Sequence, residues 1–346
     1  IMPGMIDNHV HLYWNGEPNL ALHVWKESTA MRSIKSVTWI QRSLQAGFTT
    51  LRSAAEKAYL DVALRDCRSA GLTWGSRVVA TGCSISGTGG HADLYPPWLY
   101  RTDEVPMIAD GIAECIRAVR KQIKMKVDWI KFHASGGVMD PFSNPNVQEY
   151  NDKEIKAIVE EAHRRGKLVF AHAQGAGGIR GAVKGGVDSI EHGMFLEDDI
   201  IEEMLKRGTF LCPTLVALFR IIEAGEAGGI PPESAAKAMV MGEAHISSFQ
   251  KAYKAGVKII MGTDAGSPYN YHGDNAYELK LMVENGMSEM DALVSCTKLA
   301  AENLRMEDRL GTVEPGKWAD VIVVDGDPIS DINVLVNKEN IRLVLQ

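Results

Sequence analysis

Cysteine is scarce in this chain and does not form a recognisable framework. Its 346 residues include five cysteines, an odd number with no C-x-x-C pair, at Cys67, Cys83, Cys115, Cys212 and Cys296. Such scattered residues argue against a disulfide scaffold and against a cysteine zinc cage. We therefore expect a reducing compartment and predict a cytoplasmic location.

Basic residues are fewer than acidic residues. The chain carries 37 Lys and Arg against 44 Asp and Glu, which gives a formal net charge of -7. A net negative chain is a poor partner for a polyanion, so we expect no nucleic acid partner. The basic residues between Arg117 and Lys126 are typical of the solvated face of one helix.

Long apolar runs and a signal peptide are both absent from the sequence. A membrane-spanning helix needs about 20 apolar residues in succession, so we expect no membrane partner. The chain begins at Ile1, inside an apparent strand, which is compatible with a leader or an N-terminal segment that precedes it.

Two common functional motifs are missing as well. No G-x-G-x-x-G loop follows the first apparent strand, which argues against a doubly wound nucleotide-binding fold. No G-x-S-x-G elbow is present to provide a nucleophilic serine. Cys212, in "FLCPT", has no evident activating partner in the sequence, and we interpret it as a packed core residue.

What the sequence does contain is a repeated unit of helix, glycine and strand. The unit recurs at Gly47, Gly166, Gly186, Gly208 and Gly256, with a looser copy at Gly71. A glycine just past a helix end adopts positive φ without a Cβ clash, so each one predicts a helix-to-strand junction. Strands that alternate with helices in this way are expected to be parallel and joined by right-handed crossovers.

About eight strands can be counted, which predicts an α/β fold of the (β/α)8 TIM barrel type. We assign residues 1–304 to this barrel. After it the sequence changes to turn-rich segments around "ADVIVV" and "ENIRLVLQ". We interpret residues 305–346 as a small, apparently incomplete β-sandwich appendage whose N-terminal complement is missing.

Residues that commonly bind metals fall at the ends of the predicted strands. In "MIDNHVHL", His9 and His11 alternate along one strand and therefore share a face. Similar residues end later strands, and the whole set is His9, His11, Lys131, His172, His192 and Asp264. Any one histidine there is more often structural than a ligand, but the joint arrangement at one barrel rim predicts a metal site.

Lys131 is the unusual member of this set, because an ammonium is repelled by metal cations. A lysine buried beside cations is readily deprotonated. Its neutral amine can then capture carbon dioxide, and the resulting carbamate has oxygens enough to bridge a pair of metal ions.

These segments resemble a known family. "PGMIDNHVHL", "DWIKFHASGG", "FAHAQG", "SIEHG" and "GTDAG" together are similar to the metal-dependent amidohydrolase superfamily. The stretches "SGTGGH" and "GTDAGSPYNYHGDNAYEL" most closely resemble its branch of prolidase-like and Xaa-Arg or Xaa-Lys carboxypeptidases, which includes ochratoxin-hydrolysing amidases.

The resemblance implies a cofactor, a carboxylated lysine and a reaction. His9, His11 and Asp264 would hold the more buried of two divalent ions, His172 and His192 the second, and carboxylated Lys131 would bridge them. The ions are expected to be zinc, although the same ligands accept manganese or cobalt. A metal-bridging hydroxide would then hydrolyse an amide bond in a dipeptide or N-acyl amino acid, with Asp264 as general base and then general acid.

Other functions are compatible with the same residues. The substrate can instead be a cyclic amide of the imidazolone type, or an aromatic amide such as ochratoxin. A non-catalytic assembly protein on the same fold is a further alternative, against which the complete ligand set argues. Related enzymes commonly assemble through barrel loops, so a homo-oligomer is expected.

Substrate contacts are predicted from position only. The candidates are His91, His133, Arg180, Tyr269 and His272. His91 either binds a substrate oxygen or lies in solvent, and His133 either faces the cavity of Lys131 or turns away. Tyr269, Tyr271 and His272 either line the pocket or pack their loop, and Arg180, expected in the loop after the fifth strand, is a candidate for a substrate carboxylate.

Overall fold

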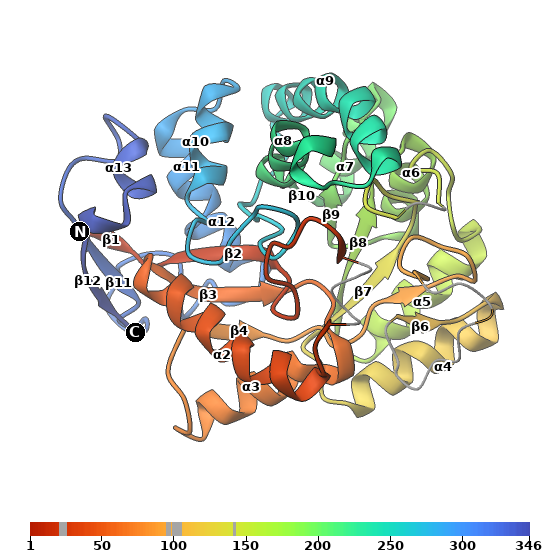
Figure 1. Cartoon of the computed structure of the whole chain (residues 1–346), viewed down its shortest axis with the longest axis horizontal. Helices are drawn as coiled ribbons and strands as arrows, with labels where there is room; N and C mark the ends of the chain where they lie inside the picture. The colour runs from red at the N-terminus through yellow and green to blue at the C-terminus, as the bar shows by residue number, and fades with distance from the viewer. Residues whose placement is uncertain (21–25, 95–97, 99–105, 141–142) are drawn as a thin grey trace.

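Parallel strands surrounded by helices form the body of the protein (Figure 1). The computed structural model describes residues 1–346 except 21–25, 95–97, 99–105 and 141–142. One run of parallel strands contains β2 (Met5–Val10), β3 (Phe48–Ser53) and β4 (Arg77–Val79). The other contains β7 (Trp129–His133), β8 (Leu168–Ala173), β9 (Ser189–His192) and β10 (Phe210–Cys212), with the short β5 (Ile85–Ser86) and β6 (Met107–Ile108) at its edge.

Backbone hydrogen bonds join the two runs into a closed barrel. On one side the amide of Asp128 donates to Ala80 O at 2.7 Å. On the other side residues 258–265 lie between β10 and β2, where they form bridges from Leu211 to Ile259 and from Val10 to Ala265. The predicted TIM barrel fold is therefore confirmed.

The eighth predicted strand, 258–265, is wrong in one respect: this segment forms isolated bridges and not a regular strand. Asp264 has a φ of +62°, which breaks the extended conformation. Thr263 turns its hydroxyl and amide to the buried carboxylate of Asp7, at 2.6 and 3.1 Å. The segment thus closes the barrel, but its backbone leaves the extended conformation at Asp264.

The crossover helices follow the strands in the predicted order. They are α2 (Thr29–Gln45), α3 (Leu60–Ser69), α4 (Gly111–Lys124), α5 (Asp152–Arg164), α6 (Ala176–Gly185), α7 (Asp198–Arg207), α8 (Leu215–Ala224), α9 (Pro232–Ala255), α10 (Tyr277–Glu284), α11 (Glu289–Ser295) and α12 (Lys298–Asn303). Among the helices that the structure describes, none is long and apolar enough to cross a bilayer.

Glycine marks the helix ends as predicted. All six glycines of the repeated unit have φ between +68° and +91°. At the other end of α5, Asn151 forms a capping box with Glu154, so the side chain of each residue binds the backbone amide of the other. These local signals fix where each helix begins and ends, and hence which residues reach the strand ends.

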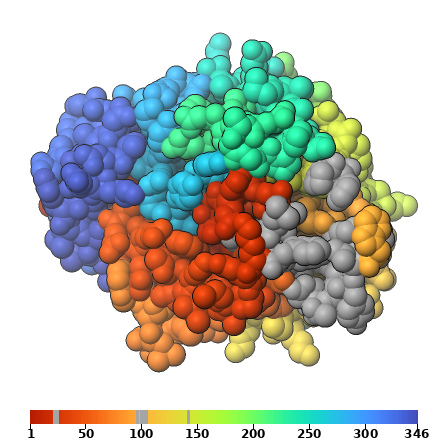
Figure 2. Space-filling model, in the orientation of Figure 1, coloured from red at the N-terminus to blue at the C-terminus, as the bar shows by residue number. Residues whose placement is uncertain are grey.

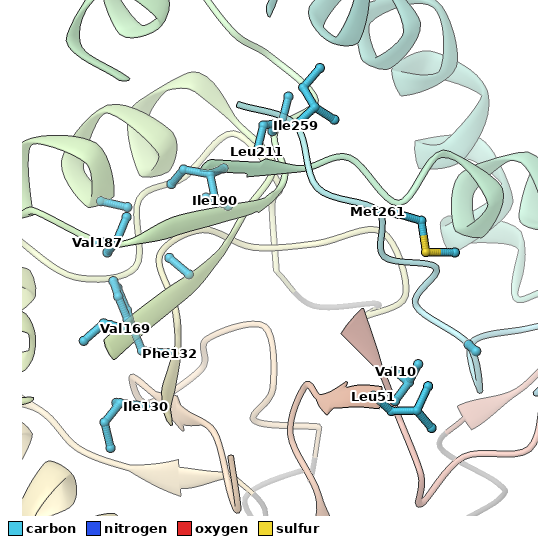
Figure 3. Close-up of a cluster of buried hydrophobic side chains, with 14 of the residues drawn as sticks. Val10, Leu51, Ile130, Phe132, Val169, Val187, Ile190, Leu211, Ile259 and Met261 are labelled. Carbon is cyan, nitrogen blue, oxygen red and sulfur yellow. The ribbon is translucent and has the colours of Figure 1, made fainter. Parts of the chain in front are cut away.

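Side chains alternate along the strands between the helices and the barrel interior. Ile130, Val169, Ile190 and Leu211 are fully buried in the main apolar core (Figure 3). Because the side-chain period of a strand is two residues, Lys131 and His172 point to the opposite side, into the barrel. The apolar pattern of the strands therefore orients their polar residues.

A small antiparallel sheet contains the predicted strands of the appendage. β11 (Val321–Val324) pairs with β12 (Ile341–Leu345), and a short helix, α13 (Asn333–Val336), lies between them in sequence. The third strand is β1 (Met2–Pro3), which pairs with β11 and so gives the appendage one short N-terminal partner strand; the missing complement stays a prediction. Figures 1 and 2 show the C-terminal residues at one end of the molecule. The assignment of 1–304 and 305–346 to separate domains stays a prediction.

Replacing Gly208 with Ala tests the cost of positive φ at a helix end. A Cβ at Gly208 would meet no atom within 4 Å, so the change strains only the backbone, whose φ is +71°. We expect a loss of about 1–2 kcal/mol of unfolding free energy, measured by denaturant titration. The matched control is Gly177→Ala near the start of α6, where φ is not positive and helix propensity predicts a gain of up to about 1 kcal/mol. Equal effects of the two changes would contradict this account.

Candidate metal centre

Three predicted ligands meet where β2 ends. His9 lies in β2, His11 follows its last residue, and Asp264 comes from the segment that closes the barrel. Asp264 Oδ1 lies 3.3 Å from His9 Nε2 and 3.0 Å from His11 Nε2. Two imidazoles and a carboxylate oxygen at these separations form a group that can bind one divalent cation.

Two further predicted ligands extend this group. His172 is the penultimate residue of β8 and His192 is the last residue of β9. Their ring centroids are 4.7 Å apart, and the ring of His192 lies 5.2 Å from that of His9. The structure therefore brings all four predicted histidine ligands into one continuous cluster at the strand ends.

Each of these four histidines has one ring nitrogen held by a protein oxygen. The pairs are His9 Nδ1 with Glu191 Oε2 at 2.5 Å, His11 Nδ1 with Ala55 O at 3.2 Å, His172 Nε2 with Gly136 O at 3.2 Å, and His192 Nδ1 with Thr214 Oγ1 at 2.7 Å. Such partners fix the ring orientation and leave the other nitrogen for a metal. His9 Nε2 is buried, and its contact with Asp264 Oδ1 at 3.3 Å brings together two atoms that can bind one ion. The donor set and this buried nitrogen fit a divalent metal ion.

Burial controls the charge of the cluster. It lowers the pKa of His11, and it lowers the pKa values of His172 and His192 well below the ordinary value, because charged rings are disfavoured away from water. Burial also opposes ionisation of Asp264, but its hydrogen bonds to His11 and His9 outweigh this effect and hold its pKa well below the usual range. Neutral imidazoles and an ionised carboxylate are the forms that bind metals.

Lys131 lies inside the barrel, only 2% exposed. Its Nζ sits 4.8 Å from the centre of the Phe170 ring, and no residue that the structure describes forms a hydrogen bond or ion pair with it. Burial lowers the pKa of Lys131 to about 8, although the charges of Glu191 and Asp264 partly oppose this shift. This shift increases the fraction of neutral amine, which is the form that carbamate formation requires.

Glu191 is a central residue that the sequence analysis missed. Its carboxylate is fully buried, accepts a hydrogen bond from His9, and forms an ion pair with Arg52 Nη2 at 2.8 Å. Arg52 and His9 together hold the pKa of Glu191 well below its usual range, against the effect of burial. Its position beside His192 in "SIEHG" was the available signal, because an acid in a buried strand needs a partner.

His91 and His133 lie against the second pair of ligands. The ring of His91 stacks on that of His172 at 4.3 Å, and the ring of His133 lies 5.1 Å from it. Both ring nitrogens of His133 and Nδ1 of His91 are buried without a hydrogen-bond partner among the described residues. Both histidines therefore face the cluster, and neither turns into solvent.

The aromatic residues after Asp264 pack their own loop. The hydroxyl of Tyr269 donates to Gly228 O. His272 Nε2 donates to His11 O at 3.1 Å, and the ring stacks on Trp39 at 5.5 Å. Backbone hydrogen bonds join this loop to the segment around Gly16, and Figure 2 shows the two segments side by side. Their side chains thus support the loop that carries Asp264, while Tyr271 is exposed.

Arg180 does not lie where the sequence analysis expected it. It belongs to helix α6 and not to the loop after β8. Its guanidinium forms ion pairs with Glu197 and Asp199. The helix begins right after Gly175, so Arg180 is carried one turn beyond the strand end and finds its partners on the neighbouring segment.

Comparison with known proteins identifies relatives over nearly the whole chain. The amidohydrolase family model matches residues 1–345. The ochratoxinase of Aspergillus niger is 33% identical over 358 residues, which cover 96% of this chain and 72% of that protein.

Solved structures of similar proteins also match this chain over almost all of its length. A Xaa-Pro dipeptidase with bound methionine in its active site superposes with a TM-score of 0.93 at 36% identity, covering 99% of this chain and 84% of that one. A prolidase complexed with N-methylphosphonate-L-proline gives a TM-score of 0.91 at 33% identity, covering 100% and 85%.

Replacing Glu191 with Gln tests its role in the cluster. The change removes the charge that compensates buried Arg52, so we expect a loss of about 3–5 kcal/mol of unfolding free energy. It also weakens the partner that orients His9, so zinc affinity should fall about 10- to 100-fold in a chelator competition assay. The exposed Glu160→Gln is the control. Unchanged zinc affinity in the Glu191 variant would contradict this role.

Proposed function

Since the chain belongs to the amidohydrolase family and hydrolyses amide bonds, we propose that its substrate is a dipeptide or an N-acyl amino acid. The observation that carries this proposal is the convergence of the four histidines and Asp264 around buried Lys131. Structural relatives named as a Xaa-Pro dipeptidase and a prolidase support a substrate that ends in a free amino acid.

We assign the cation ligands as follows. His9, His11 and Asp264 would hold one divalent ion, and His172 and His192 would hold the second. Lys131, once carboxylated, would supply the anionic oxygens shared by the two ions, and its low exposure and lowered pKa favour the neutral amine from which a carbamate forms. Zinc is the proposed metal, since neutral imidazoles and a carboxylate suit it.

When bound, a pair of divalent ions supplies an activated water at neutral pH and polarises the scissile carbonyl. The transfer of the proton is assigned to a residue of the chain. Asp264, ionised and held by His9 and His11, accepts the proton of the attacking water and delivers it to the leaving amine. The buried wall around it excludes bulk water, because His9, His172 and His192 are each at most 5% exposed.

His91 and His133 are the proposed substrate contacts. Both ring nitrogens of His133 and Nδ1 of His91 are buried without a hydrogen bond among the described residues, although Asp140 lies 3.9 Å from His91 Nδ1, and a substrate carbonyl or carboxylate would satisfy them. Tyr269, His272 and Arg180 are weaker candidates, because their polar groups already bind Gly228, the backbone near His11, and two acids respectively.

An aromatic amide is the second candidate substrate. It is favoured by the Aspergillus niger ochratoxinase, which is similar to this chain over almost its whole length. The cyclic amide, the homo-oligomeric assembly and the cytoplasmic location stay predictions from the sequence.

Metal removal tests the proposed centre directly. Purified protein should contain close to two divalent ions per chain by elemental analysis, and chelation should abolish hydrolysis until metal is restored. Lys131→Ala should reduce activity more than about 100-fold. That exceeds the effect usually seen when a residue that orients a metal ligand is replaced. Addition of a short carboxylate should restore part of the activity. Lys258→Ala, which removes an exposed lysine, is the control. Full activity after chelation would refute the proposal.

A substrate panel separates the two candidate classes. We expect dipeptides and N-acyl amino acids with proline, arginine or phenylalanine as the leaving residue to be cleaved with higher kcat/KM than ochratoxin-type aromatic amides. Mass spectrometry of the products identifies the bond that breaks. A panel in which only the aromatic amide is cleaved would reverse the order of the two candidates.

A further inference from the structure

Lys237 lies on α9, outside every set of residues considered above. Its Nζ donates to three backbone carbonyls, those of Gly137 at 3.2 Å, Asp140 at 2.6 Å and Ser143 at 2.6 Å. All three carbonyls belong to the connection that follows β7. Since an ammonium has three N–H donors, the hydrogen-bonding capacity of Lys237 is fully used by this connection.

Apolar packing holds the same connection against α8 and α9. Val138 is 3% exposed and belongs to a separate apolar cluster with Leu218, Ala238 and Met241. Helices α8 and α9 lie together over this side of the barrel (Figure 1). Val138 therefore secures the connection in place, whereas Lys237 fixes the direction of its carbonyl groups.

The adjoining peptide groups contact the candidate metal centre. Gly136 O accepts the hydrogen bond from His172 Nε2, one residue before the carbonyl that Lys237 binds. Gly137 packs so closely on His91 that an added Cβ would lie 2.2 Å from its ring. The residues Gly136 and Gly137 thus connect Lys237, which binds Gly137 O, to His172, which binds Gly136 O, and to His91, which packs on Gly137.

We infer that Lys237 is a positioning residue that aims His172 at the second metal ion through two successive residues, Gly137, whose carbonyl it binds, and Gly136, whose carbonyl binds His172. This inference rests on the proposed function. The hydrogen bond from Nε2 to Gly136 O leaves Nδ1 of His172 as its metal-binding atom, and a carbonyl free to rotate would no longer fix that choice. His11 and Asp264 form no hydrogen bond or ion pair with the described residues of this connection, so the first metal ion should be unaffected.

The charge and shape of Lys237 are both required. The three acceptors surround one tetrahedral ammonium, whereas a planar guanidinium would present its donors in a fork. Lys237→Met keeps roughly the length of the side chain and removes all three N–H donors. Lys237→Arg keeps the positive charge, but its planar donors cannot reach the three carbonyls in the same arrangement. Lys251, also on α9, is exposed and has only a distant acid partner at 3.9 Å, so Lys251→Met is the matched control.

The test measures metal affinity and activity together in the full chain. Zinc content is determined at a series of chelator-buffered free zinc concentrations, and initial rates are measured in the same buffers. In Lys237→Met we expect the second zinc ion to bind about 10- to 100-fold more weakly while the first is unchanged, the range typical of outer partners of metal ligands. Activity should return when free zinc is raised, and Lys237→Arg should lie between the parent and Lys237→Met.

Three outcomes would overturn the inference. They are unchanged affinity for both ions in Lys237→Met, equal weakening of both ions, and equal effects of Lys237→Met and Lys251→Met. If excess zinc does not restore the lost activity, Lys237 instead supports the fold as a whole, and the inference is also wrong. If the parent chain itself fails to bind two ions or to cleave any amide, the proposed function fails, which is a distinct result seen before any variant is compared.

Discussion

The buried ion pair between Glu191 and Arg52 is the interaction on which the interior of the barrel depends. It joins β9 to β3 and, through His9, to β2, so three strands that are distant in sequence share one charged group. Burying such charges costs several kcal/mol per ion unless their partners are well placed. Here Arg52 is also held by Asn8 O at 2.6 Å and by Asn303 at 3.0 Å. Any change of register in these strands would leave a charge without compensation.

The barrel gathers its charged and metal-binding residues on the interior face of the strands, beside the ring of Phe170. Apolar side chains of the strands pack against the helices, while the interior contains Glu191, Arg52, Lys131 and the histidines. The connections at the carboxyl ends of the strands then refine the geometry of single rings. Gly136 O, Ala55 O and Thr214 each take one histidine nitrogen, so backbone and loop atoms decide which nitrogen is left for chemistry.

The barrel was predictable because its signals are local. A glycine at a helix end and alternation along a strand act within a few residues, and both patterns are present in full in the sequence. The extended strand predicted over 258–265 and the loop position of Arg180 failed for a shared reason. Thr263 binds the distant Asp7, and α6 begins directly after Gly175, so that Arg180 lies in a helix; neither feature is visible in the local pattern.

For the candidate site, the sequence by itself determined which residue types stand at the strand ends and hence the expected set of His9, His11, Lys131, His172, His192 and Asp264. Only the tertiary structure decided their partners. Glu191, paired with Arg52, binds His9; His91 and His133 lie against His172; and Lys237 binds the carbonyl of Gly137. The physical reason is that strand position follows from side-chain periodicity along the chain. Hydrogen-bond direction, charge compensation and ring orientation instead depend on atoms that meet only when the barrel closes.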